Sequence, residues 1–201
     1  MKSAVKRKIM DRKYKILLIF SSVIIVLDQV TKYLIVENFH LGETAPLILN
    51  FFNLTYVQNK GAAFGLLSQA DPSFRVPFFV IVPFVALGSI AYVFRKLPSL
   101  DVKLAVALSL IISGALGNLI DRIRLGYVVD FLDFHWKWLY HFPSFNVADS
   151  AICIGVGLVM LDLFTEDSYQ KNDQKSAQKS VAEKKSALAK KGSYVNASNT
   201  R

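Results

Sequence analysis

Four long apolar stretches alternate with polar and charged segments along the chain, at residues 16–36, 74–94, 104–120 and roughly 142–164. Each approaches the about 20 residues that an α-helix needs to cross the hydrocarbon core of a bilayer. The first begins like a secretory signal peptide, but its hydrophobicity continues to Val36 and no small-residue cleavage site follows. The pattern therefore predicts four retained transmembrane helices.

The segments outside the apolar stretches predict further features. The connection 37–73 is long, and residues 50–64 within it have the β-branched and aromatic character of strands, so we expect a small external β element. Residues 165–201 are too polar to build a core and are expected to be disordered or to form a helix on anionic lipid. The expected parts are a basic N-terminal segment (1–15), a membrane domain (16–164) and a polar basic tail (165–201).

Composition narrows the class of protein. Hydrophobic residues make up 53% of the chain, yet its formal net charge is +9, a combination that is unusual for a soluble domain. The cations flank the apolar stretches and form no patch interleaved with base-stacking aromatic residues, so nucleic acid is not an expected partner. Cys153 is the single cysteine, which excludes an intrachain disulfide.

The distribution of lysine and arginine predicts the orientation in the membrane. Residues 1–15 hold seven, residues 95–103 hold three and residues 165–201 hold eight of the 24 lysines and arginines. Membrane proteins concentrate such residues on the cytoplasmic side. We therefore expect both termini to be cytoplasmic, with connections 37–73 and 124–143 outside.

Charged residues inside the apolar stretches need partners, because a charge at the centre of a membrane helix costs at least about 2.5–3.5 kcal/mol. Asp28 and Lys32 lie one turn apart in the order that favours an ion pair, and we expect a structural role for them. Asp121 shares a helix face with Asn118 and has Arg122 beside it in sequence. We expect nearby arginines to keep Asp121 ionised and occupied in a structural contact.

Asp130 and Asp149 differ from these residues, because neither has a cation adjacent in sequence and both have apolar neighbours. If Ser144 is the N-cap, Asp149 lies about five residues, or roughly 7–8 Å, into the fourth helix. Asp130 follows the third helix on the same outer side. Two acids meeting there predict an aspartic peptidase, with one carboxylate as base for water and one carboxylic acid polarising the carbonyl.

Several alternatives remain open. The two aspartates could instead cap a helix or anchor a loop, and the residues alone do not exclude Asp121 or Asp133 as a catalytic group. The main rival function is a proton-coupled small membrane transporter, which four spans without an inverted repeat and acids confined to one face argue against. A noncatalytic membrane scaffold predicts that Asp130→Asn is harmless.

The sequence gives less support to a metal-dependent peptidase or a cysteine peptidase. No ligand spacing such as His-Glu-x-x-His occurs, so no metal ion is expected. Cys153 lies a full turn deeper than Asp149, and His135, Trp136 and Trp138 are typical of an interfacial aromatic belt.

Small residues repeat every four positions on the last two predicted helices. Ser109, Ser113 and Gly117 form such a row on the third, and Ala151 and Gly155 form one on the fourth. Rows of this kind permit two membrane helices to approach closely.

Five segments, in this order, resemble the lipoprotein signal peptidases, also called signal peptidase II, and the similarity covers about residues 16–164. The segments are Asp28-Gln29-Val30-Thr31-Lys32, Asn59-Lys60-Gly61-Ala62-Ala63-Phe64, Gly117-Asn118-Leu119-Ile120-Asp121-Arg122, Val128-Val129-Asp130-Phe131 and Phe145-Asn146-Val147-Ala148-Asp149-Ser150. The resemblance implies an all-α membrane protein with four transmembrane helices and a small external β-cradle that lies on the membrane.

The resemblance also implies a function. It implies a multi-pass enzyme of the bacterial inner membrane that removes signal peptides from prolipoproteins, cutting just before a cysteine that carries diacylglycerol. Diacylglyceryl-prolipoprotein signal peptides and membrane lipids are the implied partners, and inhibition by globomycin-type compounds is expected. An acid pair needs no cofactor.

Individual residues match the family pattern. Asp130 and Asp149 match the catalytic dyad, near the outer face of the membrane. The residues that match the polar lining of the substrate pocket are Asn59, Asn118, Arg122 and Asn146.

Overall fold

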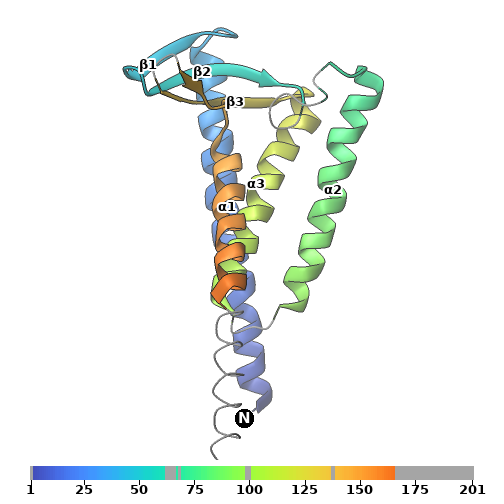
Figure 1. Cartoon of the computed structure of the whole chain (residues 1–201). Coiled ribbons are helices and arrows are strands. Elements are labelled where there is room, and N and C mark those ends of the chain that lie inside the picture. The colour runs from blue at the N-terminus through green and yellow to red at the C-terminus, as the bar shows by residue number, and fades with distance from the viewer. Residues whose placement is uncertain (1, 62–66, 68, 98–100, 137–138, 166–201) are drawn as a thin grey trace, which may run out of the picture. The chain divides into compact units, whose positions relative to one another are not determined.

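A computed structural model of the chain describes residues 2–61, 67, 69–97, 101–136 and 139–165 (Figure 1). Most of them belong to one compact unit, residues 1–159. In the described part of the chain, four helices are long and apolar enough to cross a membrane, which confirms the predicted number. They are the Arg12–Asn38 part of α1 (Lys2–Asn38), α2 (Pro72–Lys96), α3 (Val102–Leu125) and the helix Val147–Thr165. Trp138 and the tail after Thr165 lie outside the described residues.

The last helix begins later than the apolar pattern predicts. Residues 142–144 are not helical, and Phe145 pairs with Leu132 through two backbone hydrogen bonds of 2.8 and 3.1 Å. The prediction that Ser144 caps this helix is therefore wrong. Pairing with a strand keeps residues 142–145 extended, and Val147 is the first helical residue.

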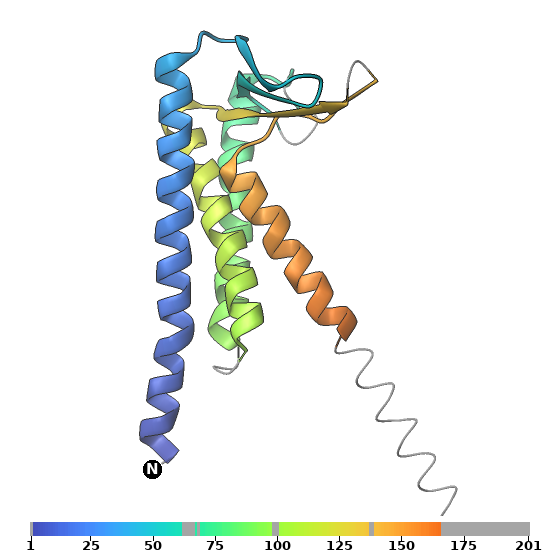
Figure 2. The same ribbon diagram turned by 90° about the vertical axis from the view of Figure 1, so that its left-hand side faces the viewer.

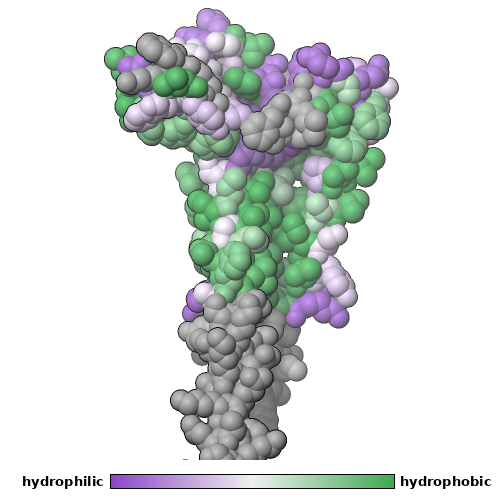
Figure 3. Space-filling view, viewed as in Figure 1, coloured by the Kyte–Doolittle hydropathy of each residue, from purple (hydrophilic) through white to green (hydrophobic). Residues whose placement is uncertain are grey.

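Helix α3 is the most buried of the four. Its apolar side chains pack in one cluster with residues of α2 and the residue that follows it: Leu87, Phe94, Leu97, Ala105, Leu108, Ile112 and Leu119. The other three helices expose many apolar side chains, and Figure 3 shows these as hydrophobic surface along the helices. Such surface suits helices that face lipid.

Small residues let α3 and the helix Val147–Thr165 touch, as their four-residue spacing predicts. A Cβ atom on Gly155 would lie 2.6 Å from the carbonyl oxygen of Ala107, and one on Gly114 would clash with the carbonyl of Ala148. Ser109 and Ser113 are fully buried and donate to carbonyls within α3. The two backbones therefore meet at van der Waals distance.

One antiparallel sheet lies across one end of the helices (Figures 1 and 2). Its strand order is β1-β2-β3-β4, with β1 at Thr44–Ile48, β2 at Phe52–Asn59, β3 at Val128–Trp136 and β4 at Tyr140–His141. The first two strands confirm the predicted β element. The connection 124–143, for which the sequence analysis predicts no strand, contributes the other two strands.

The sheet is fixed to the helices at two places. Helix α3 is capped by Gly126, whose positive φ of 77° allows the chain to turn directly into β3. Val129 and Phe131 of β3 then pack with Ile35 of α1 and Tyr56 of β2. Because side chains alternate along a strand, this packing turns Asp130 to the opposite face.

Candidate active site

Asp130 lies near the start of β3 and is only 2% exposed. Its Oδ1 accepts a hydrogen bond from Asn146 Nδ2 (2.7 Å), and its Oδ2 accepts one from Asn59 Nδ2 (3.0 Å). Burial, and secondly the like charge of Asp149, raise the pKa of Asp130 to about 7, although the two asparagines oppose the shift. At neutral pH this carboxyl is therefore held near half protonation.

Asp149 lies in the first turn of the helix Val147–Thr165, which is nearer to the helix end than predicted. Asn146 is the N-cap: its Oδ1 accepts from the Asp149 N–H (2.9 Å), and Asp149 Oδ2 accepts from the Asn146 N–H (3.3 Å). This reciprocal pair is a capping box, here with aspartate in the position often held by glutamate. Asp149 therefore does cap its helix, as one of the alternatives predicts. Its side chain also accepts from Asn118, beside Asp130.

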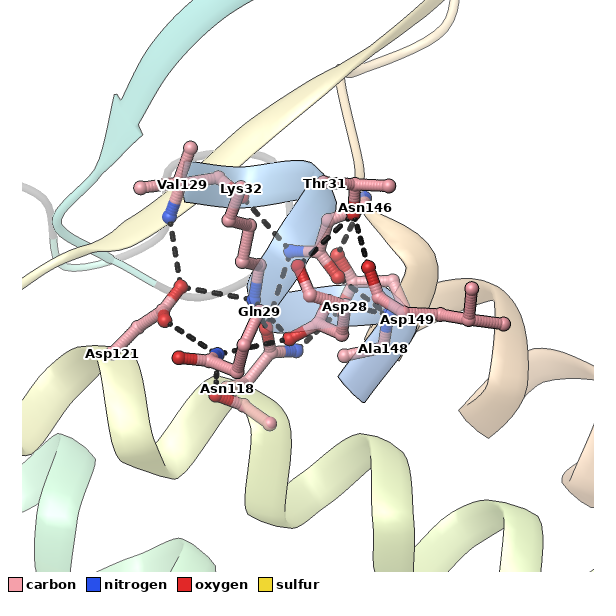
Figure 4. A network of polar contacts seen from close by, with 12 residues as sticks. Asp28, Gln29, Thr31, Lys32, Asn118, Asp121, Val129, Asn146, Ala148 and Asp149 are labelled. Atoms are coloured by element: carbon pink, nitrogen blue, oxygen red, sulfur yellow. Dashed lines mark hydrogen bonds and ion pairs between the residues drawn. The ribbon is translucent and has the colours of Figure 1, made fainter. Parts of the chain in front are cut away.

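Two asparagines connect the aspartates, and Figure 4 labels both of them together with Asp149. Asn118 Nδ2 donates to Asp149 Oδ1 (2.7 Å), while its Oδ1 accepts from Asn146 Nδ2 (3.1 Å). Asn146 is fully buried and contacts both acids, through its side-chain amide to Asp130 and its Oδ1 to the Asp149 backbone. Each carboxylate therefore has a fixed orientation.

A buried ion cluster supports this pair of acids from α1. Lys32 Nζ lies 2.9 Å from Asp28 Oδ2 and 2.9 Å from Asp121 Oδ2, and it donates to Asn118 Oδ1 (3.0 Å). The predicted pair of Asp28 and Lys32 is confirmed. Asp121, however, pairs with Lys32 of another helix, and not with the neighbouring Arg122 as expected, because its carboxylate points toward α1.

Residues of α1 also position the helix that carries Asp149. Asp28 Oδ1 accepts from the backbone N–H of Ala148 (2.9 Å), one residue before Asp149. Gln29 Nε2 donates to Asp121 Oδ1 (2.9 Å), a role that the sequence analysis did not identify. Its position directly after Asp28 is the one feature of the sequence that pointed to Gln29 as a residue of the site.

Arg122 lies beside the acid pair, although within the described part of the chain no ion-pair contact joins them. Its Nη2 donates to the carbonyl of Gly61 (3.2 Å), and its guanidinium stacks 5.3 Å from the centre of the Phe79 ring. Asp149 and Asp130 both interact electrostatically with it. Arg122 thus contributes positive charge at the edge of the site.

Other candidates lie elsewhere. Asp133 is further along β3, where it accepts from Asn53 Nδ2 (2.9 Å) and lies 3.7 Å from His135 Nδ1. Cys153 is exposed on the last helix. Among the described residues, no three or more of the His, Cys, Asp and Glu side chains are grouped so that they could hold a metal ion.

Comparison with known proteins assigns the family. The family model described as signal peptidase (SPase) II matches residues 20–165, which include every residue of the site. The chain belongs to the signal peptidase II family. The lipoprotein signal peptidase of Geobacter sulfurreducens is 55% identical over 152 residues, which cover 74% of this chain and 93% of that protein. That of Geobacter metallireducens is 49% identical over 164 residues, covering 82% of this chain and 99% of its own length.

Solved structures agree with the family assignment. A bacterial membrane enzyme solved by the in meso method at 2.3 Å resolution superposes with a TM-score of 0.68 and 37% identity, over 76% of this chain and 89% of that chain. A second such structure, at 1.9 Å resolution, gives a TM-score of 0.65 and 34% identity. As a signal peptidase II, the chain is a bacterial multi-pass inner-membrane protein and a peptidase.

Proposed function

We propose that this peptidase removes signal peptides from prolipoproteins by hydrolysing the bond just before a diacylglyceryl-modified cysteine, with Asp130 and Asp149 as its catalytic pair. The observation that carries the proposal is the arrangement of these two carboxyl groups, which interact electrostatically and are held by asparagines at the sheet end of the membrane helices. Family membership supports the substrate class.

The environment of each acid suggests its role. Asp149 lies at a helix N-terminus, where the helix dipole and free N–H groups favour negative charge, so it is the base. Asp130, with its pKa raised to about 7, is protonated in about half of the molecules at neutral pH and is the acid. Two neighbouring carboxyl groups that share one proton are the arrangement found in aspartic proteases.

Hydrolysis then follows in two steps. A water oxygen bonds to the scissile carbonyl carbon while Asp149 takes the water proton and Asp130 gives its proton to the carbonyl oxygen. The tetrahedral diol collapses as its C–N bond breaks, the proton on Asp149 passes to the leaving nitrogen, and a hydroxyl proton returns to Asp130. One water is consumed, and the products are a signal peptide with a new carboxyl group and a lipoprotein with a free amino group on its cysteine.

The asparagines and Arg122 are proposed to serve the substrate as well. Asn59, Asn118 and Asn146 already donate to the two carboxylates, so their first role is to position the acids. Arg122 keeps donors beyond its bond to Gly61, and these can reach the backbone of a bound peptide. A globomycin-type inhibitor is expected to occupy the same site.

The substrate assignment is tested by cleavage with purified protein. A prolipoprotein carrying diacylglycerol on its cysteine should be cut once, and the masses of both products should place the cut immediately before that cysteine. The same prolipoprotein without diacylglycerol should be cut much more slowly, because it lacks the acyl chains that hold the substrate at the site. Equal rates, or a cut elsewhere, would contradict the proposed specificity.

The pH dependence of cleavage tests the assigned roles. Asp130 must be protonated to act as acid, so the rate should fall as pH rises through about 7, the pKa of this carboxyl. At low pH, protonation of the base should also lower the rate, which gives a bell-shaped profile. Rates should be measured from about pH 4 to 9 in one detergent, with Asp133→Asn as a control expected to keep the midpoint. A rate that stays constant above pH 7 would remove Asp130 from the role of acid.

We also propose that both termini are cytoplasmic and that the sheet and the acid pair are on the periplasmic side. The concentration of cations in residues 1–15, 95–103 and 165–201 supports this orientation. A periplasmic reporter fused within 37–73 should be active, and one fused after Lys103 or at the C-terminus should be inactive. The reverse pattern would place the acids on the cytoplasmic side and overturn the orientation.

A further inference from the structure

A second polar feature lies beside the acid pair, at the same end of the helices. It is a narrow, partly open cleft lined by Lys60, Arg75, Val76, Phe79, Arg122 and Gly126. These residues come from the position after β2, the first turns of α2 and the end of α3 with the turn that follows. Three of them are cations, and of the described residues that line the cleft none is acidic.

Arg122 is held rigidly in the wall of this cleft. Its bond to the Gly61 carbonyl and its stacking on Phe79 fix the guanidinium plane and use only part of its hydrogen-bonding capacity. A guanidinium fixed in this way suits a phosphate or carboxylate group, because its forked donors match the geometry of such anions.

Lys60 is placed by its neighbours in sequence. Asn59 turns inward to Asp130, and its Oδ1 also accepts from the Gly61 N–H (3.0 Å). The residue between them, Lys60, is exposed and lines the cleft. Lys60 therefore follows directly, in sequence, a residue that orients Asp130, and it adds a cation to the cleft.

Helix α2 adds one cation and an apolar wall. Arg75, Val76 and Phe79 lie within its first two turns and line the cleft together. Asp71, the N-cap of α2, interacts electrostatically with Arg75, but its Oδ1 accepts from the Ser73 N–H (2.8 Å) and it does not line the cleft. Phe74 and Val76 are exposed on the same helix, where acyl chains would lie.

We propose that this cleft binds the phosphodiester of an anionic phospholipid, with Lys60, Arg75 and Arg122 around the phosphate and the acyl chains along α2. A cluster of cations beside apolar side chains at the end of membrane helices matches the two parts of such a lipid. The diacylglyceryl group of the proposed substrate carries no charge, so the substrate lipid does not account for Lys60 and Arg75, the two cations of the cleft that the proposed peptidase mechanism does not use. The inference goes beyond the proposed peptidase activity and holds for either orientation of the chain.

Lipid binding is measured on the full chain in detergent by native mass spectrometry, a readout that does not depend on cleavage. Phosphatidylglycerol should bind more tightly than phosphatidylcholine with the same acyl chains. Arg75→Gln and Lys60→Gln should each weaken phosphatidylglycerol binding about fivefold, the effect of one basic residue near a lipid surface. Arg75→Lys should retain most of the binding, since it keeps the charge.

The matched control is Arg124→Gln. Arg124 is exposed at the same end of α3 but does not line the cleft, so this variant should change binding less than about twofold. The proposal is overturned if the two lipids bind equally or if Arg75→Gln, with an unchanged unfolding temperature, binds as the wild type does. Displacement of the lipid by excess inorganic phosphate would assign the cleft to free anions, and displacement by an acidic peptide alone would assign it to a protein; either result rejects the lipid.

Discussion

Asp130→Asn and Asp149→Asn are each expected to lower the rate of cleavage about 10³-fold or more and to leave a folded protein, because each removes one half of the proton transfer. Asparagine keeps the shape of the side chain and its oxygen still accepts from one neighbour. At position 130 the new amide group would face a donor from Asn59 or Asn146. This unsatisfied contact should lower the free energy of unfolding by about 1–3 kcal/mol. Rates should be compared under single-turnover conditions, with unfolding temperature and binding of a globomycin-type inhibitor as measures of folding.

The chain offers a closely matched control for Asp130→Asn. Asp133 lies on the same strand and accepts from Asn53 Nδ2 at 2.9 Å, as Asp130 accepts from Asn59 at 3.0 Å. Asp133→Asn therefore removes the same charge and disturbs the same kind of hydrogen bond, and it should retain most of the activity. If either Asp130→Asn or Asp149→Asn cleaved at near the wild-type rate, the assignment of the catalytic pair would have to be given up.

Lys32→Met is expected to cause a large loss of stability. Lys32 is the one cation within ion-pair distance of both Asp28 and Asp121, which are 0% and 3% exposed in the described structure. Removing it leaves two buried carboxylates without that partner, and breaking a buried pair in this way costs about 3–5 kcal/mol. The yield of folded protein and its unfolding temperature in detergent should both fall sharply.

Two comparisons separate this effect from a general loss of charge. Asp28→Asn should be milder, because Asp121 still neutralises Lys32 and the new amide oxygen can still accept from Ala148. Lys103→Met removes an exposed lysine from the first turn of α3 and should change the unfolding temperature little. A wild-type unfolding temperature for Lys32→Met would show that the cluster does not hold the bundle together.

The helices and the acid pair were predictable because their signals are local. A run of about 20 apolar residues identifies a membrane span by its length alone. Asp130 and Asp149 stood out because each lacks a cation nearby in sequence, whereas Asp28 has Lys32 one turn later. The Asp28–Lys32 pair is likewise a contact within one helix, and its distance of 2.9 Å confirms the prediction.

Features that depend on contacts between distant segments were missed. The strands β3 and β4 form because β3 pairs with β2, about 70 residues earlier in the chain, and that pairing has no local signature beyond the short apolar run around Asp130. Phe145 stays extended because it bonds to Leu132, which moved the helix start from Ser144 to Val147. Asp121 was assigned to its sequence neighbours because the approach of Lys32 from α1 requires the packed structure.

Cleavage by metal-depleted protein tests the central claim most directly, since two carboxyl groups and one water are proposed to perform the whole reaction. Purified wild-type protein is treated with EDTA and assayed on a lipidated prolipoprotein in metal-free buffer, beside Asp130→Asn. The account predicts an unchanged wild-type rate and no measurable cleavage by Asp130→Asn. Loss of the wild-type activity in EDTA and its recovery on addition of zinc would contradict the two-aspartate mechanism and require a metal-assisted one.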